Sequence, residues 1–433
     1  MRKNKNSKRK ENIDPSKILI QSQSATINDS PDDILCHLST ISPSVESIDD
    51  FSDEILCHIL SFLPTKEAFR TTVLSKRWLF LCYSLPVIYY DDNVKSHFPQ
   101  FMEAIMFSPH SQHKTLKSLI LKFHSCNKYL DDTAGCFPFD KWMEAAKSRN
   151  LEELDISYLL GIPLVPTIFC RKTLVVLNLT GISVATMLHC SVDLPLLEFL
   201  SLSEVHFKHM EDLMKLLSGC PKLLDLRTRH VTATTGITTG GYFKPLSKLF
   251  YADICLFEVP VRAVSNVEHL VLRKLWMWES FLNEEINSYY KSYPVFENLV
   301  ILSLLWVDPG FIRDWEYEVV NMFQNCPKLE EFNMSKWWNL NLPNSKDKED
   351  WKYPDHVPEC VSSHLKICKI NDYQAVEADF RFVTYILQNA NHLQSMEINY
   401  SKNRNSMENH QFIEDLSSCP RISPVCEFSI NPR

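Results

Sequence analysis

The hydrophobic positions of this 433-residue chain follow two different periodicities, and the change lies near residue 115. Between residues 49 and 85, apolar residues recur at positions i, i+1, i+4, i+5 and i+8, which places them on one face of a helix. Ser52 stands where it can cap this helix, and Pro64 prevents the helix from continuing. The residues of this face are Ile55, Leu56, Ile59, Leu60 and Leu63.

Two further short helices are predicted in the same region. Thr65 can cap a helix that carries Phe69, and Ser75 can cap a helix that carries Trp78. Three helices of about ten residues each are too short to build a deep core. We therefore expect a partner protein to cover part of their apolar surface.

Beyond residue 115 a short motif, apolar-x-x-apolar-x-apolar, recurs eleven times. Some of its starts are 21 to 26 residues apart and others 28 to 36. The triplets are Leu116/Leu119/Leu121, Leu151/Leu154/Ile156, Leu174/Leu177/Leu179, Leu197/Leu200/Leu202, Leu223/Leu226/Thr228, Leu246/Leu249/Tyr251, Val267/Leu270/Leu272, Leu299/Leu302/Leu304, Leu329/Phe332/Met334, Leu365/Cys368/Ile370 and Leu393/Met396/Ile398.

A short strand that recurs at this interval is typical of a leucine-rich-repeat solenoid, in which each strand stacks beside the previous one in a parallel sheet. The unequal intervals predict an irregular array with convex segments of variable length. We therefore predict an α/β fold, with a three-helix N-terminal unit followed by an irregular leucine-rich-repeat solenoid. The segments SGCPKLLDL, QNCPKLEEF and QNANHLQSM predict helices that end just before a strand, with Cys220 and Cys326 buried at the turns.

Composition narrows the functional class. Apolar residues make up 45% of the chain and charged residues 23%, and no run of 18 apolar residues exists, so we expect no membrane partner. The basic start MRKNKNSKRK has no apolar stretch behind it, which favours the nucleus or the cytoplasm. A net charge of -8 argues against general nucleic-acid binding.

Motifs for catalysis, cofactors and metals give weak signals. The richest glycine patch, residues 236–241, lacks the Lys and Ser or Thr of a phosphate-binding loop, and neither G-x-S-x-G nor H-E-x-x-H occurs. His356, Cys360, His364 and Cys368 have a spacing that could suit zinc on one helix. Pro358 interrupts that helix, and Cys368 occupies the second apolar position of a repeat triplet. We call the apolar positions of a triplet its slots. We therefore predict no catalytic residues, no cofactor and no metal site.

An aromatic segment, residues 275–296, is inserted between two repeats. Trp276, Trp278, Tyr289 and Tyr290 are candidate anchors for a target protein, because large aromatic residues dominate interface hot spots. Packing beneath a long loop is the alternative role for these rings.

A known family is recognisable at this point. The segment IDDFSDEILCHILSFLPTKEAFRTTVLSKRWLFL, residues 48–81, resembles the F-box, with Phe51 and Ser52 where that family more often has Leu-Pro. Stretches such as FDKWMEAAKSRNLEELDIS and CRKTLVVLNLTGISV are similar to the repeats of plant F-box proteins. Residues 357–399 resemble the FBD segment of the same group. The resemblance covers about residues 48 to 400 and implies a plant F-box/FBD/leucine-rich-repeat protein.

This resemblance implies a non-catalytic substrate adaptor of a Skp-cullin-F-box ubiquitin ligase. The F-box would dock on the Skp-type subunit and through it on a cullin, while the repeats would bind a target protein for ubiquitination. The expected parts are a disordered polar arm (1–47), the F-box (48–92), the solenoid (93–350) and FBD-like repeats (351–433). The residues expected to contact the Skp-type subunit, or to pack the domain that does, are Ile55, Leu56, Ile59, Leu60, Leu63, Pro64, Val73, Leu74 and Trp78.

The chain contains two similar heptads, DDILCHL at residues 32–38 and DEILCHI at residues 53–59. In the first copy, Ser39 and Ser42 stand opposite Leu60 and Leu63 of the second, and no further helices follow. We predict that the second copy works and that the first is a silent, truncated duplication.

Two other functions remain open. An F-box-containing receptor for a small molecule would need a pocket on the repeat face, and no Arg or Lys cluster recurs at one strand position. A leucine-rich-repeat interaction protein that does not enter a ligase is the second alternative, and the Phe51-Ser52 departure is consistent with it.

Overall fold

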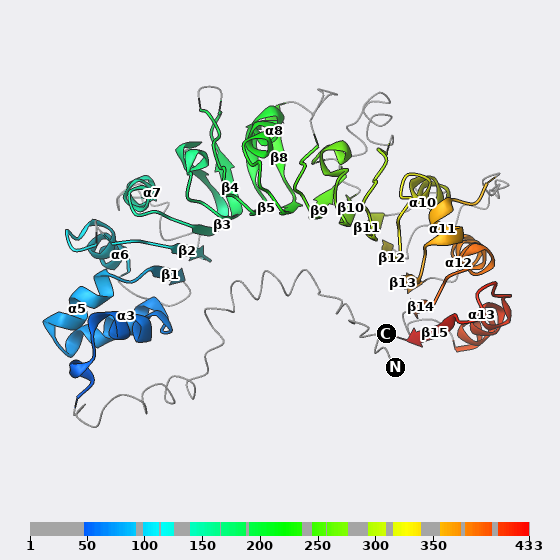
Figure 1. Ribbon diagram of the computed structural model, residues 1–433, viewed down its shortest axis with the longest axis horizontal. Helices are drawn as coiled ribbons and strands as arrows, with labels where there is room; N and C mark the ends of the chain where they lie inside the picture. Colours follow the sequence, from blue (N-terminus) through cyan, green and yellow to red (C-terminus); the bar gives the residue numbers. More distant parts are fainter. Residues whose placement is uncertain are drawn as a thin grey trace, which may run out of the picture. The chain divides into compact units, whose positions relative to one another are not determined.

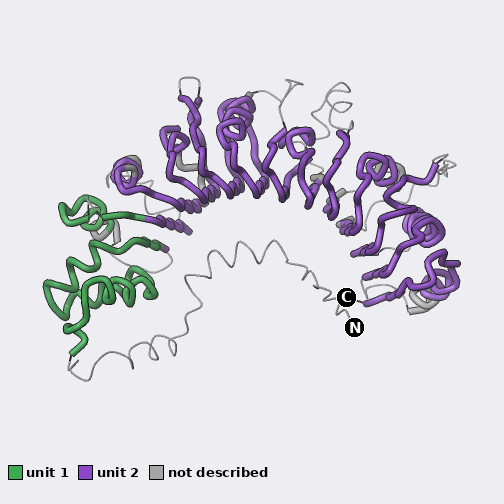
Figure 2. The backbone as a smooth tube through the Cα atoms, in the orientation of Figure 1, with its two compact units in different colours: residues 1–90, 97–116 green, residues 91–96, 117–433 purple. Residues whose placement is uncertain are grey.

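A computed structural model of the chain describes residues 47–91, 98–111, 114–124, 139–164, 166–187, 190–235, 245–256, 258–275, 293–308, 315–338, 356–373, 377–400 and 406–432. The chain forms two compact units, one of residues 1–90 and 97–116 and the other of residues 91–96 and 117–433 (Figure 2). The truncated heptad copy, the glycine patch and the four candidate anchors Trp276, Trp278, Tyr289 and Tyr290 lie outside the described residues.

The first unit is mostly helical, and its three predicted helices are confirmed. Its elements are η1 (Ile48–Asp50), α3 (Asp53–Ser61), α4 (Thr65–Arg70), η2 (Thr71–Val73), α5 (Lys76–Tyr83), β1 (Val87–Asp91) and α6 (Phe98–Phe107).

The helix caps of the first unit agree only in part with the sequence-based expectation. Ser52 caps α3, and its hydroxyl accepts a hydrogen bond from the Ile55 amide at 3.5 Å. The predicted cap at Thr65 is wrong, because Pro64 is the N-cap of α4 and makes no side-chain bond. The Thr65 hydroxyl instead accepts a hydrogen bond from the Tyr89 amide at 2.8 Å, which ties β1 to α4.

The second unit is a long parallel sheet with helices on one side, which confirms the predicted solenoid. Its strand order is β2-β3-β4-β5-β7-β9-β10-β11-β12-β13-β14-β15. Outside this order, β6 pairs with both β4 and β8. Figure 1 shows the strands along the inner side of this curved unit and the helices along its outer side.

The strands are β2 (Ser118–Phe123), β3 (Glu153–Leu164), β4 (Val176–Val184), β5 (Phe199–Ser203), β6 (His206–His209), β7 (Asp225–Arg229), β8 (Thr232–Thr235), β9 (Tyr251–Cys255), β10 (His269–Leu275), β11 (Ile301–Asp308), β12 (Glu331–Trp338), β13 (Ile367–Tyr373), β14 (Ser395–Tyr400) and β15 (Glu427–Pro432). The helices are α7 (Phe139–Lys147), α8 (Met210–Ser218), α10 (Trp315–Phe323), α11 (Glu359–Ser363), α12 (Glu377–Asn389) and α13 (Ser406–Ser418), with 3-10 turns η3 (Pro166–Cys170) and η4 (Val261–Val264).

The register of the sheet places ten of the eleven predicted triplets in continuous buried rows. In β10 to β14, for example, Leu270, Leu302, Phe332, Cys368 and Met396 are consecutive partners. All five side chains are buried, because the corresponding side chains of successive repeats stack on the same face of the sheet.

The predicted triplet Leu246/Leu249/Tyr251 is wrong by three residues. Leu270 of β10 pairs with Ala252, so the slots of β9 are Leu249, Ala252 and Ile254. Tyr251 occupies a position beside the slots and is only half-buried. The sequence also gave no signal for the last strand, β15, which pairs with β14 in parallel.

The predicted helix ends before strands are confirmed for α8, α10 and α12. Gly219 ends α8 at a close approach, where an added Cβ would lie 2.3 Å from Cγ1 of Val192. Cys220 and Cys326 are buried at these turns, and each thiol donates a hydrogen bond to the carbonyl four residues earlier. Burial raises the pKa of Cys220 to about 12, so these thiols are packing groups.

Candidate functional site

The apolar residues of the three-helix region divide into a core and an exposed set. Leu56, Leu60 and Trp78 are buried, and they pack with Ala68, Leu81, Cys82 and Leu85 into one cluster. Ile59 is half-buried against the same cluster. These four of the nine predicted partner-contact residues therefore belong wholly or partly to the support of the site.

The other five predicted residues are exposed. Ile55 lies in the first turn of α3 and is 36% exposed, and Leu63, in the connection to α4, is 40% exposed. Pro64 next to it is also exposed. Val73, the last residue of η2, is 86% exposed, and Leu74, which follows it, is 59% exposed. We call Ile55, Leu63, Pro64, Val73 and Leu74 the exposed apolar set.

Local hydrogen bonds explain why Val73 and Leu74 are exposed. The helix α4 stops at Arg70, and the chain tightens into the 3-10 turn η2. The hydroxyls of Thr71 and Thr72 donate to the carbonyls of Ala68 and Phe69 at 2.5 and 2.8 Å. The Thr71 backbone amide donates to the same two carbonyls, so the hydroxyls add to the capping of this helix end. The end of η2 leaves the large apolar side chains of Val73 and Leu74 in water, which folding alone does not favour.

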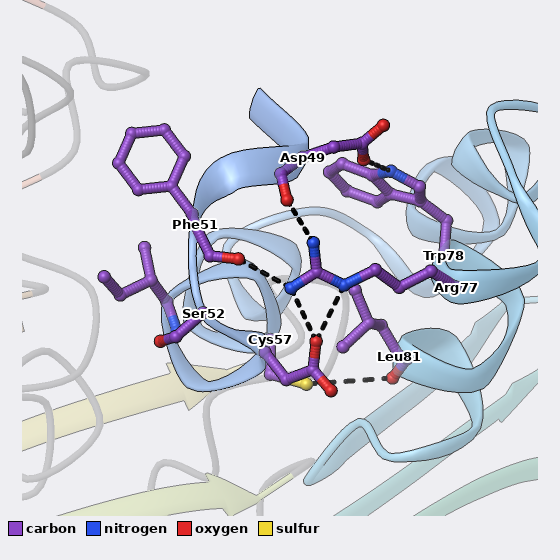
Figure 3. A network of polar contacts seen from close by, with 9 residues as sticks. Asp49, Phe51, Ser52, Cys57, Arg77, Trp78 and Leu81 are labelled. Carbon is purple, nitrogen blue, oxygen red and sulfur yellow. Dashed lines mark hydrogen bonds and ion pairs between the residues drawn. The ribbon is translucent and has the colours of Figure 1, made fainter. Parts of the chain in front are cut away.

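Arg77 fastens the start of the region to α5, as Figure 3 shows. Its guanidinium donates to the carbonyl of Asp49 and, at 2.6 Å, to the carbonyl of Phe51. It also donates through Nε to the carboxylate of Asp53 at 2.9 Å. A planar guanidinium can hold several acceptors at once, and an ammonium cannot reproduce this geometry. Arg77 therefore fixes η1 and the first turn of α3, which carries Ile55.

Trp78 completes the same network from inside the core. Its indole Nε1 donates to the carboxylate of Asp49 at 2.8 Å while the ring is buried (Figure 3). Phe51 packs partly against the core, and Ser52 caps α3. The Phe51-Ser52 departure thus leaves the helix α3 in place.

Sequence reasoning did not assign a role to Arg77 or Asp49. In the sequence, the segment VLSKRW indicates only a third helix, and Asp49 and Asp50 indicate only an acidic start. Arg77 pairs with the carboxylate of Asp53, 24 residues earlier, and reaches Asp49, 28 residues earlier, through its backbone carbonyl. Sequence spacing alone does not connect these residues.

Two of the four residues with zinc-like spacing have structural roles. Cys368 fills a buried slot of β13, and the Cys360 thiol donates to the carbonyl of Phe323 at 3.3 Å. Pro358 is the N-cap of α11. Within the described ranges, no three His, Cys, Asp or Glu side chains are arranged to hold a metal ion. Likewise, none of the described helices has the length and apolar character needed to cross a bilayer.

Comparison with protein-family models gives three matches in order along the chain. Residues 48–89 match the F-box domain, which covers the exposed apolar set and the Arg77 network. Residues 139–286 match the leucine-rich repeats of the FBD-associated F-box protein At5g56370, and residues 353–398 match the FBD model.

Relatives with the same order of parts occur in Arabidopsis thaliana. The chain is 27% identical to the F-box/FBD/LRR-repeat protein At5g56420, an alignment that covers 84% of this chain and 93% of the relative. It is 25% identical to the F-box/FBD/LRR-repeat protein At2g04230, over 76% of this chain and 83% of the relative. A shorter match of 34% identity to the F-box/FBD/LRR-repeat protein At5g56570 covers 31% of this chain and 28% of the relative.

The three matched regions fall on the two units in the expected way. The F-box match lies in the helical first unit, and the repeat and FBD matches lie on the parallel sheet of the second. Having an N-terminal F-box, a leucine-rich-repeat region and a C-terminal FBD domain, and relatives with the same parts over most of its length, the chain belongs to the plant F-box/FBD/LRR-repeat family.

Proposed function

We propose that this protein is the substrate-recognition subunit of a Skp-cullin-F-box ubiquitin ligase. In this role the first unit docks on the Skp-type subunit, which connects it to a cullin. The repeats of the second unit bind the target protein. The adaptor forms and breaks no covalent bonds itself.

The observation that carries the proposal is the division of the F-box into a core and an exposed apolar set. Leu56, Leu60 and Trp78 are buried in the core, whereas Val73 and Leu74 remain largely in water. Exposed apolar side chains on a rigid support are typical of a protein-binding surface. The F-box match covers all of these residues.

The proposed mechanism is proximity. An adaptor that holds a target near a ubiquitin-charged enzyme raises the effective concentration of the target's lysines at the thioester. The rate gain then depends on the simultaneous occupation of two sites, one on the F-box and one on the repeats. Loss of either contact should abolish ubiquitination of the target.

The test is binding of the full-length protein to a purified Skp-type subunit. Val73→Ser and Leu74→Ser together should weaken this affinity at least about tenfold, because hot-spot anchors of this size dominate interfaces. The variant should fold normally, since both side chains are exposed. Isothermal titration calorimetry gives the affinity, and a thermal melt checks the fold.

Val425→Ser is the matched control, because Val425 is also exposed, at 65%, but lies in the second unit. It should bind the Skp-type subunit as the unmodified protein does. Equal affinity of the Val73/Leu74 variant and the unmodified protein would refute the docking surface. Absence of binding by the unmodified protein would refute the adaptor role and favour an interaction protein outside any ligase.

A further inference from the structure

The inner face of the second unit carries a row of large side chains that the core does not use. Side chains of a strand alternate between the two faces of a sheet, so residues beside the buried slots point to the inner face. The register aligns one such residue from each of six neighbouring strands. This inner row consists of Val176, Phe199, Asp225, Tyr251, His269 and Ile301, on β4, β5, β7, β9, β10 and β11. Apart from the buried Asp225, all are half-buried.

The centre of the inner row is held rigid by an arginine between two rings. The Arg227 guanidinium lies 5.2 Å from the centroid of the Phe199 ring and 5.0 Å from that of Tyr251. It also donates two hydrogen bonds to the carboxylate of Asp225, at 3.0 and 2.9 Å. The Asp225 contact is the main cause that raises the pKa of Arg227 further, so the guanidinium stays charged. Both rings are thus fixed before any partner arrives, which lowers the entropy lost on binding.

The positive charges at the row are already neutralised by the protein itself. Arg227 is paired with Asp225, and Arg273 is paired with Asp253 through two hydrogen bonds at 2.5 and 2.6 Å. These two arginines therefore have little charge left for an acidic partner.

The negative charges that flank the row are not neutralised. Glu152, Glu198 and Glu268 directly precede β3, β5 and β10, and all three are exposed. None of them makes an ion pair within the described residues, whereas Glu330 at the equivalent place before β12 is paired with Lys366 at 2.7 Å. The exposed Arg229 lies at the opposite end of β7. At the positions directly before the strands from β3 to β11, the charged side chains are therefore these three carboxylates, and the exposed Lys222 and Lys248 lie two residues further back, before β7 and β9.

We propose that the inner row is the target-binding surface and that it takes an extended segment in which apolar or aromatic side chains alternate with Lys or Arg. The apolar side chains would pack on Phe199, Tyr251 and Ile301, and the cations would face Glu152, Glu198 and Glu268. Aromatic residues with preorganised geometry provide affinity, and complementary charge selects the partner. This inference rests on the proposed function, and it names the chemistry of the target.

The experiment begins with a displayed library of random peptides selected on the full-length protein. Selected peptides should be enriched in Lys or Arg alternating with apolar or aromatic residues. One selected peptide is then labelled, and its affinity is measured by fluorescence anisotropy at two salt concentrations. Affinity should fall as salt rises, because exposed charges are screened.

Four variants separate the parts of the surface. Tyr251→Ala should weaken peptide binding at least about tenfold, whereas Tyr251→Phe keeps the ring and should retain binding. The Glu198→Gln, Glu268→Gln double variant leaves the packing unchanged and should reduce both affinity and salt dependence. Glu397→Gln removes a charge from β14, outside the inner row, and should have no effect.

Failure of this inference is distinguishable from failure of the adaptor role. Enrichment of acidic peptides, no enrichment, or selected peptides that bind Tyr251→Ala normally would each overturn the inner row as a basic-segment site. Binding of the Skp-type subunit is measured in the same variants and should be unchanged. If the unmodified protein does not bind the Skp-type subunit but still selects peptides of the expected kind, only the ligase role is refuted.

Discussion

At the scale of single residues, Glu258 makes the stability of the second unit depend on pH. It follows β9, is only 3% exposed, and its amide donates to the carbonyl of Cys255 at 3.1 Å. Burial raises the pKa of its carboxyl from 4.5 to about 7, and the neighbouring Cys255 and Thr228 lower it only in part. A carboxyl with this pKa is protonated in the folded protein at pH values where the unfolded chain is ionised.

The sign of the effect follows from proton binding. Between pH 4.5 and about 7 the folded protein binds more protons at this site than the unfolded chain, so the free energy of unfolding falls as pH rises. The stabilisation is complete below pH 4.5 and lost above about 7. The difference amounts to roughly 3 kcal/mol.

Glu258→Gln should flatten this dependence, because the amide does not ionise. The variant should be more stable than the unmodified protein at pH 8, and the difference should shrink toward pH 5. Urea unfolding at pH 5, 6, 7 and 8 measures this, with the exposed Glu268→Gln as the control. Parallel pH profiles for Glu258→Gln and the unmodified protein would contradict the assignment.

At the scale of elements, α3 has two kinds of apolar position that differ in what they support. Leu60 is buried in the core of the first unit, whereas Leu63, just after the helix, is 40% exposed. Leu60→Ala should cost about 3 kcal/mol, because it leaves a cavity. Leu63→Ala should cost less than about 1 kcal/mol.

The two variants should rank in the opposite order for affinity to the Skp-type subunit when both are compared in the folded state. Hydrogen exchange of the α3 amides reports stability, and calorimetry at a temperature where both variants are folded reports affinity. Under these conditions Leu63→Ala should bind more weakly than Leu60→Ala. A result in which Leu63→Ala alone lowers α3 protection would show that our division of the helix face is wrong.

This division illustrates what the sequence could predict and what it could not. The helical spacing of Ile55, Leu56, Ile59, Leu60 and Leu63 correctly predicts α3, but all five are similarly apolar. Their separate roles depend on contacts with residues about 20 positions away, such as Trp78 and Leu81. Local pattern contains no information on these contacts.

The repeats were predictable because a slot residue recurs and the register follows from it. The prediction was wrong at β9, because the small Ala252 occupies a slot there and Leu246 lies three residues before the true first position, Leu249. The Arg227 stack was also invisible, because Phe199, Arg227 and Tyr251 are brought together only by the register of three strands. A residue pattern therefore predicts where strands lie, whereas the side chains that meet across neighbouring strands are known only from the register in the structure.

At the scale of the whole molecule, the described part of the first unit begins with a capped turn. Ser47 and Asp50 form a capping box, in which the Ser47 amide donates to the Asp50 carboxylate at 2.9 Å and the Asp49 amide donates to the Ser47 hydroxyl at 3.3 Å. The free backbone groups at the start of η1 are thereby satisfied within four residues. Arg77 then anchors this start to α5.

Deletion of residues 1–45 should therefore leave binding of the Skp-type subunit unchanged, although it removes the heptad copy at residues 32–38. Ser47→Ala in the full-length chain is the informative comparison, because it removes the cap and should destabilise the start of the unit by about 1 kcal/mol. Calorimetry compares both proteins with the unmodified chain. An affinity loss of about tenfold or more on deletion would mean that the first heptad copy contributes to docking, and the F-box surface would then extend beyond residues 48–89.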